Sequence, residues 1–508
     1  MRSSNSKLRE EQIKLSGNVR RLNPAYGNHS LQSLVISLSA LLTVFMLLFV
    51  IVTGAELVSM VPWVVLVLAM VVGTWSLRHL RAQRFDYRNR STILPAIIGF
   101  SIIPIVVVPV LTQTSGQTRS KLSNSGIVRA YDLDSNLAPI LILSASVLLA
   151  ATGAMVGGKI GGSKMRTSFG FGQSFLAQNK ERVRLTHSVF LVAGLLGAVV
   201  SRFVGVGSVA ERGTVQGAGV TVMIGWCLPL AIAMGFSYRH FGDRWRLVAS
   251  FVGLGLLVSG DVRSPILLVF IGIVVGAVFP IQVDGIPTSR WSEKTRTAVL
   301  LFAAVSTALV SAFISSWRGV RIRNEDKSVW GVANDVLGDP LNYIALSGLD
   351  SYDGIRLAIA AAKANYESSI FDPLKGVVNL IPRSIYPDKE AWLGNELTLK
   401  MLGWQKGGIF LSGVGYVLVL SGSIVVALAI IWVIGAILGF IESRAGTNMM
   451  AVTLTAYFSV RFLMGGDAFD IQHVLMLAIA CFIVGAVSRV VYAVAQTGEY
   501  RFTMKGAL

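Results

Sequence analysis

Long runs of apolar residues, almost free of charged side chains, restrict the possible folds of this chain more than any other feature. The run 424–441, for example, contains no Asp, Glu, Lys or Arg. An α-helix crosses the roughly 30 Å hydrocarbon core of a bilayer with about 20 such residues. Irregular backbone in contact with lipid leaves its polar groups without hydrogen bonds, so helices are the expected form. With 53% hydrophobic and 14% charged residues among 508, the composition excludes an ordinary soluble globular protein.

We therefore predict an all-α polytopic membrane protein with about twelve transmembrane helices. The predicted spans are 32–53, 56–77, 91–112, 137–157, 187–205, 218–236, 247–260, 265–280, 297–315, 408–441, 446–464 and 471–492. The seventh and eighth are short for a full crossing, and the tenth is long enough to contain a break at Ser421, Gly422 and Ser423. Breaks of this kind usually border a cavity. The first apolar run begins near Leu31 and is long enough to span, which argues against a cleaved signal peptide.

The distribution of Lys and Arg predicts the orientation. Outside the spans, the two tails and every second short loop carry 26 Lys or Arg in total, whereas the alternate short loops carry 5. The positive-inside rule then places both termini in the cytoplasm. The net charge of +18 is accounted for by anionic lipid headgroups and implies no nucleic-acid partner. The predicted regions are a basic cytoplasmic tail at 1–31, transmembrane helices at 32–315, a large extracytoplasmic loop at 316–407, transmembrane helices at 408–492 and a cytoplasmic tail at 493–508.

The cysteines, a glycine-rich segment and an acidic pair could each indicate another class of site, but none of them supports one. Cys227 and Cys481 both fall inside predicted spans, which offers neither a disulfide framework nor a cysteine metal site. The segment 153–160 nearly matches a phosphate-binding loop, but Ile160 occupies the Ser/Thr position and the segment ends a predicted membrane helix. The spacing of Gly153, Gly157 and Gly161 instead predicts close packing between helices. The acidic pair Asp132 and Asp134 is a pattern that arises easily by chance.

The large loop at 316–407 carries eleven Lys or Arg and reads as folded. Long loops cross the membrane regardless of charge, so these residues do not contradict the orientation. Two stretches have apolar residues at helical spacing, with Arg356 and Lys363 on other faces of the first: Ile355, Ala358, Ile359, Ala362 and Tyr366, then Leu393, Leu397, Met401 and Trp404. Two amphipathic helices are expected, which lie on the outer membrane surface, cap the bundle, or pack together without lipid contact.

The stretch 379–396, with the sequence NLIPRSIYPDKEAWLGNE, separates these helices. Pro382 and Pro387 stiffen it. Arginine offers a planar fork suited to phosphate oxygens and lysine a compact charge, so Arg383 and Lys389 at the membrane surface suit a lipid-linked phosphate or diphosphate. The alternative is a solvated turn in which Lys389 lies near headgroups and Asp388 pairs with a neighbouring cation.

Pro382-Arg383 followed by Tyr386-Pro387-Asp388-Lys389, in the large outer loop and ahead of the Gly/Ser-rich run 407–423, resembles the O-antigen polymerases, the Wzy-type oligosaccharide repeat-unit polymerases. The resemblance covers about residues 316–495. It implies a glycosyltransferase in the bacterial plasma membrane that needs no cofactor and resembles the C-type glycosyltransferase class. Its implied substrate is an oligosaccharide on undecaprenyl diphosphate, moved en bloc onto the next lipid-linked repeat unit at the outer face. A chain-length regulator protein is a further candidate partner beside the membrane lipids.

Breaking a bond between an anomeric carbon and a diphosphate develops negative charge on the leaving oxygens, which requires fixed positive donors. The predicted outer-face candidates are Arg383, Lys389, Arg263, Arg461, Arg321 and Arg323, with Arg318 beside the last two. Arg461 and Arg263 lie within or at the edge of predicted spans, where a charge is expensive unless it is functional or extends to the surface. The other three, Arg318, Arg321 and Arg323, follow the ninth predicted span. Basic residues at such a position are equally typical of an anchor at the membrane surface.

The acceptor hydroxyl must also lose a proton, so a carboxylate or imidazole is expected within reach of it. The candidates are Asp467, His473, Glu396 and Asp388, of which His473 is the only histidine expected on the outer face. Tyr386 and Trp392 are candidates for contact with the substrate. A flippase for lipid-linked oligosaccharide or a glycan ligase remains an alternative. A flippase is expected to have charges along a two-sided path and related halves, whereas here the polar chemistry collects on one face.

Overall fold

The computed structural model describes the residues 137–163, 180–203, 224–238, 243–258, 264–278, 282–283, 286–287, 293–322, 326–369, 371–378, 381, 385–386, 393–403, 409, 411–445, 449–465 and 468–505. The predicted tail at 1–31 and the spans 32–53, 56–77 and 91–112 lie outside them. The described elements are α7 (Leu137–Ser163), α9 (Lys180–Phe203), α11 (Cys227–Tyr238), α12 (Arg244–Val258), α13 (Ser264–Val278), β1 (Gln282–Val283), β2 (Ile286–Pro287), α14 (Glu293–Ile322), α15 (Val329–Gly338), α16 (Pro340–Lys363), η5 (Asp372–Leu374), α17 (Lys375–Val378), α18 (Leu393–Leu402), α19 (Gly413–Ser421), α20 (Ile424–Ala445), α21 (Met449–Gly465) and α22 (Ala468–Lys505).

The regular secondary structure of the described part is helical apart from β1 and β2, which form a short antiparallel pair. Four helices are long and apolar enough to cross a membrane, as expected of a membrane protein: Ala138–Gly158, Arg184–Phe203, Ile424–Arg444 and Val474–Val494. They coincide with the fourth, fifth, tenth and twelfth predicted spans. Helices α12 and α13 have 15 residues each. At 1.5 Å per residue they are about 22 Å long, so both are short, as the sequence indicates.

The tenth apolar run forms two helices. Ser412 caps the start of α19 by accepting a hydrogen bond from the backbone N–H of Gly415, and Gly422 ends α19 in the left-handed conformation at φ 63°. Glycine adopts this conformation without the steric penalty of a Cβ atom. Helix α20 then starts at Ile424. The predicted break is confirmed, and of the two helices that it separates only α20 has the length of a crossing.

Glycines bring α7 and α20 into close contact. A Cβ atom added to Gly153 would lie 2.2 Å from the Trp432 carbonyl oxygen, and one added to Gly157 would lie 1.8 Å from that of Ala436. On the other helix, the same addition at Gly439 would come within 2.0 Å of the Ala154 carbonyl oxygen. This confirms the predicted packing role of the glycine spacing. Residue numbers rise together along the two contact faces, so α7 and α20 run parallel.

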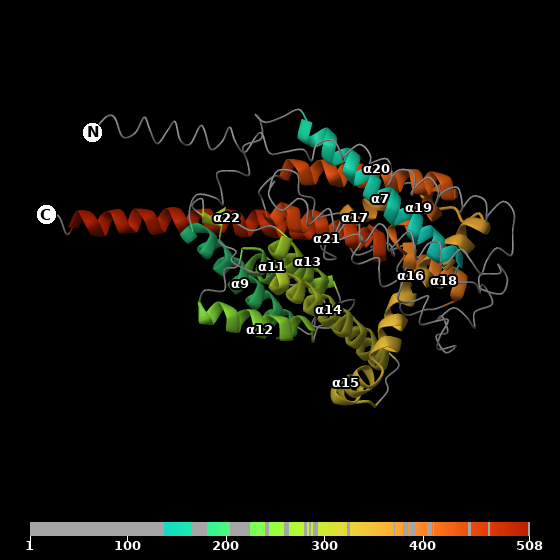
Figure 1. Ribbon diagram of the computed structural model, residues 1–508, viewed down its shortest axis with the longest axis horizontal. Helices are drawn as coiled ribbons and strands as arrows, with labels where there is room; N and C mark the ends of the chain where they lie inside the picture. The colour runs from blue at the N-terminus through green and yellow to red at the C-terminus, as the bar shows by residue number, and fades with distance from the viewer. Residues whose placement is uncertain are drawn as a thin grey trace.

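Two hydrophobic clusters of buried residues form the core of the described part. One joins residues of α7, α16, α18, α19 and α20 with Phe462 of α21. The other joins residues of α9, α11, α13, α21 and α22. Figure 1 shows α16, α18 and α19 toward one end of the molecule, with the C-terminal end of α22 at the opposite end and α15 at the lower edge. Helices α16, α18 and α19 thus lie at one end of the packed helices.

The two helices predicted in the large loop are present as α16 and α18. Ile355 and Ala358 on α16, and Leu397 on α18, are fully buried in the first cluster. Of the three arrangements left open by the sequence, capping of the bundle fits these contacts. The expectation that Arg356 lies on another face of this helix is wrong, because its side chain is only 3% exposed. It donates a hydrogen bond of 2.9 Å to Asp353, which lies three residues earlier and is equally buried. The pairing of the two charges allows both to enter an apolar core.

Candidate functional site

A network of polar side chains connects the segment after α16 with η5, α17, α18 and α19. Tyr366, the first residue of the network along the chain, is positioned by the end of α16, where Asn365 adopts the left-handed conformation at φ 50°. The backbone N–H of Tyr366 then donates to the carbonyl oxygen of Ala361 at 2.9 Å. This closure of the helix end turns the chain and brings Tyr366 beside α18.

Glu396 on α18 is the centre of the network. Its Oε1 atom accepts hydrogen bonds of 2.7 Å from the Tyr366 hydroxyl and 2.7 Å from the Lys400 ammonium group. Lys400 also donates to the Tyr366 hydroxyl at 3.2 Å and lies over the ring of that tyrosine. The other carboxylate oxygen of Glu396 is 3.9 Å from Nζ of Lys375 on α17. These contacts hold the carboxylate in place, while the Glu396 side chain remains 29% exposed.

These contacts decide the protonation of Glu396. Burial raises the pKa of its carboxyl group, but the hydrogen bonds from Lys400 and Tyr366 outweigh burial and the pKa is lowered overall. Burial, followed by the hydrogen bond to Glu396, raises the pKa of Tyr366, and the hydrogen bond to Glu396 raises the pKa of Lys400. At neutral pH the arrangement therefore contains an ionised carboxylate, a neutral tyrosine and a charged lysine.

Asp372 continues the network toward the bundle core. Its carboxylate is 2% exposed, accepts a 2.7 Å hydrogen bond from the Tyr416 hydroxyl on α19 and lies 2.8 Å from Nζ of Lys375. Lys375 thus lies between Asp372 and Glu396. The two carboxylates and the two ammonium groups of the network balance in charge. A group of this kind can accept a proton from a hydroxyl and can present ammonium groups to an anionic ligand.

Of the predicted site residues whose side chains the structure describes, Glu396 belongs to the network. Tyr386 is 37% exposed. Arg461 lies partly buried on α21, and His473 and Arg321 lie on α22 and in the last turn of α14. The candidates outside the described residues are Arg383, Asp388, Lys389, Trp392, Arg263, Arg323 and Asp467.

Four residues of the network were not predicted from the sequence as site residues: Asp372, Lys375, Lys400 and Tyr416. Spacing gave a partial signal, because Glu396 and Lys400 are four residues apart, and Asp372 and Lys375 are three apart, which are the separations of neighbours on a helix. Tyr416 lies in an apolar run, 44 residues from Asp372 in sequence. No local pattern indicates that contact.

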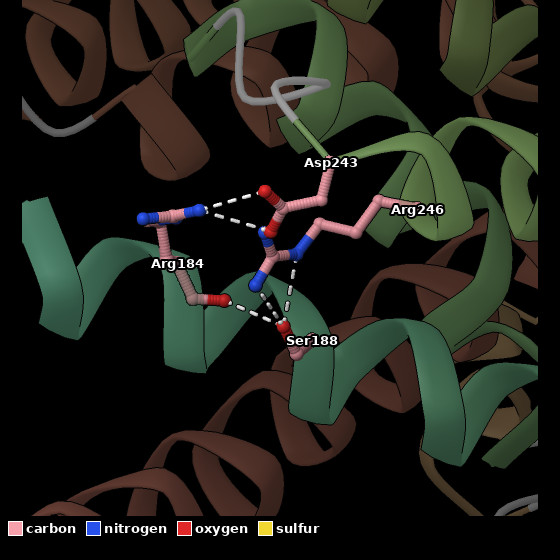
Figure 2. Close-up of polar contacts among 4 residues, drawn as sticks. All are labelled: Arg184, Ser188, Asp243 and Arg246. Atoms are coloured by element: carbon pink, nitrogen blue, oxygen red, sulfur yellow. Dashed lines mark hydrogen bonds and ion pairs between the residues drawn. The ribbon is translucent and has the colours of Figure 1, made fainter.

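A second polar cluster joins the N-terminal half of α9 to the start of α12 (Figure 2). One guanidinium nitrogen of Arg184 donates to both carboxylate oxygens of Asp243, at 2.8 and 3.0 Å. Arg246 pairs with the same carboxylate and donates to the hydroxyl of Ser188 at 2.8 Å, and that hydroxyl donates to the Arg184 carbonyl oxygen at 2.8 Å. The hydrogen bond from Arg184, ahead of the charges of both arginines, lowers the pKa of Asp243. The cluster therefore holds the start of α12 against the N-terminal half of α9.

Among the described residues, no group of three or more His, Cys, Asp or Glu side chains is arranged to hold a metal ion. Comparisons with protein-family models, with curated proteins and with solved structures found no match to this chain. The candidate site therefore rests on its own geometry.

Proposed function

We propose that this protein polymerises oligosaccharide repeat units linked to undecaprenyl diphosphate, by en bloc glycosyl transfer on the outer face of the bacterial plasma membrane. The observation that carries the proposal is the Glu396 carboxylate, held ionised by Tyr366 and Lys400. It lies in the predicted extracytoplasmic loop, where the resemblance to O-antigen polymerases also lies.

In this proposal Glu396 is the general base. The hydroxyl oxygen of the incoming repeat unit forms a bond to the anomeric carbon of the growing chain, and the bond from that carbon to the diphosphate oxygen breaks. The hydroxyl proton passes to Glu396. A carboxylate with a lowered pKa suffices because the hydroxyl becomes strongly acidic as its oxygen bonds to carbon. The electron pair of the broken bond leaves with undecaprenyl diphosphate.

The charge balance of the network supports this role. Once Glu396 takes up the proton, the ammonium groups of Lys375 and Lys400 are opposed by Asp372 alone, so the network gains one positive charge as negative charge develops on the leaving diphosphate. Fixed charge of that sign stabilises such a transition state. Arg383 and Lys389 belong to the connection between α17, which carries Lys375, and α18, which carries Glu396. That connection is therefore tethered to the network at both ends, and we assign its two cations to the diphosphate.

The orientation of α7 and α20 supports the proposed topology. Two parallel helices that both cross a membrane have an odd number of crossings between them. The five spans predicted between α7 and α20 satisfy this condition, and they place the segment from α14 to α20 on the side opposite the termini. With the three spans predicted before α7, the proposal is twelve crossings, cytoplasmic termini and a fold of the C-type glycosyltransferase class.

Purified protein incubated with lipid-linked repeat units provides the test, with products separated by size. We expect a ladder from the wild-type protein and none from Glu396→Gln, which keeps the shape of the side chain but cannot accept the proton. The matched control is Glu367→Gln, an exposed carboxylate in the same loop, which should give a normal ladder. Arg383→Ala should also abolish lengthening.

The same assay separates the rival functions. A ligase would move the glycan only when a different acceptor is added, and a flippase would move lipid-linked units across a vesicle membrane without forming a glycosidic bond. A normal ladder from Glu396→Gln would remove Glu396 from the reaction. Absence of a ladder from the wild-type protein, together with transport or transfer to another acceptor, would overturn the polymerase assignment.

A further inference from the structure

Helix α15 exposes a large apolar face at the edge of the molecule. Trp330 is 78% exposed and Leu337 is 66% exposed. They lie seven residues apart, which puts them on one side of the helix, and Leu341 at the start of α16 extends the apolar surface at 57% exposed. Figure 1 shows α15 at the periphery, beyond the other labelled helices.

The opposite face of α15 fixes its depth relative to the membrane. Val332 and Val336, each 2% exposed, pack with Ala312 and Val320 of α14. Ala312 lies within the predicted span 297–315, and Val320 lies just beyond its end. Because α14 rises about 1.5 Å per residue, the contact covers about 12 Å at the end of the crossing. Helix α15 therefore lies beside the boundary between hydrocarbon and headgroups, and its exposed face points away from the protein.

The polar groups of α15 are adapted to that position. Its only ionisable residue is Asp335, which pairs with Lys327. Ser328 caps the helix by accepting a hydrogen bond of 3.0 Å from the backbone N–H of Gly331. With its charge paired and its first turn capped, the helix can enter a region of low polarity at small cost. Tryptophan is enriched at membrane interfaces because its ring is apolar and its N–H is polar.

We propose that α15 is an interfacial helix whose Trp330–Leu337 face inserts into the phospholipid leaflet on the side of the large loop. Apolar area combined with few charges is typical of helices that lie in the plane of the interface. The packing of α15 against the end of the span predicted in α14 favours lipid as the occupant of this face over a second protein. The inference is independent of the catalytic proposal, since it requires only that α14 crosses the membrane. Through the direct connection from α15 to α16, it anchors the helix that leads to the polar network.

Site-directed fluorescence in liposomes tests this proposal on the full chain. Cys227 and Cys481 are replaced by Ala, and Trp330→Cys or Leu337→Cys then carries an environment-sensitive fluorophore in vesicles of phosphatidylethanolamine and phosphatidylglycerol. The control is Glu367→Cys, an exposed position near the end of α16. We expect lipids with a spin-labelled acyl chain to quench positions 330 and 337 several-fold more strongly than position 367, and iodide in the water to show the reverse order.

Two results would overturn the proposal. Equal quenching by iodide at all three positions would mean that the exposed face of α15 is in contact with water and not with lipid. Shielding of positions 330 and 337 from both quenchers, with a disulfide between two copies of the Trp330→Cys variant, would make the occupant a second copy of the chain. Because the two labelled residues are exposed on the protein surface, their replacement removes no internal packing, and the two positions check each other.

Discussion

The contact between α7 and α20 leads to a prediction in which two neighbouring residues respond in opposite directions to the same substitution. In Gly157→Ala the added Cβ atom would lie 1.8 Å from the Ala436 carbonyl oxygen, whereas in Gly158→Ala the nearest atom is the Gly439 carbonyl oxygen at 3.9 Å. The first distance is a steric clash with backbone and the second is an ordinary contact. Gly157→Ala should therefore destabilise the protein, while Gly158→Ala should be neutral or stabilising.

The distances set the magnitude. Close C···O contacts between helices are about 3.3–3.6 Å, so α20 would have to retreat by about 1.5 Å at Ala436. Because glycine contacts join the two helices along their length, a shift of α20 would weaken the packing of the whole α7–α20 interface. Overpacking of this kind costs about 1–3 kcal/mol. Both variants gain about 1 kcal/mol of helix propensity from the change of Gly to Ala, so this gain cancels when they are compared, and the difference isolates the clash.

Melting of the purified variants in detergent, followed by intrinsic fluorescence at one heating rate, measures the difference. A fixed rate is needed because large membrane proteins seldom unfold reversibly and their midpoints depend on the scan. We expect Gly157→Ala to melt several degrees below Gly158→Ala. Equal midpoints for the two variants would refute the packing of α7 against α20 described above.

Further predictions concern the charged pairs. Tyr366→Phe removes a hydrogen bond that holds Glu396 ionised, so the pKa of Glu396 should rise, which infrared spectroscopy of its carboxylate band can measure with Glu396→Gln as the blank. Asp353→Asn breaks a buried ion pair and should lower the free energy of unfolding by about 3–5 kcal/mol, measured by unfolding in increasing SDS. The pKa of Asp243 is lowered in the folded protein, so its contribution to stability is present above its unfolded-state pKa and is lost as the pH falls through the folded-state pKa. Arg184→Ala should weaken this acid-side loss, visible as a flatter dependence of the melting temperature on pH below about pH 5.

Features with a local sequence signal could be predicted for this chain. Apolar runs gave α7, α9, α20 and α22 because hydrocarbon and protein cores both select apolar side chains over the length of a helix. The glycine spacing on α7 and the break at Gly422 are also local, since each depends on what a missing Cβ atom permits.

The same physics explains the failures. Helix α19 and helix α20 are both apolar, and hydropathy alone does not separate a helix buried in protein from one that faces lipid, so the predicted span 408–441 includes the short helix α19 together with α20. Arg356 was assigned to another face because a single charge in an apolar pattern is normally solvated, and its pairing with Asp353 cancels that preference.

The polar network lay beyond local patterns for a different reason. Its members come from four elements and from the segment after α16, and the contact of Asp372 with Tyr416 joins residues far apart in sequence. Glu396 was found because the chemistry of the expected reaction requires a carboxylate. The side chains that hold Glu396 in place were found only through the fold.

Helix α22 offers a practical consequence. Its 38 residues rise to about 57 Å, whereas its apolar stretch ends at Val494. Figure 1 shows the last part of this helix running clear of the others toward the C-terminus. A helical fusion partner joined in phase to Lys505 would continue the same axis and move with the protein as one rigid piece. Such a rigid fusion would give single-particle electron microscopy a fiducial marker for particle alignment outside the detergent belt.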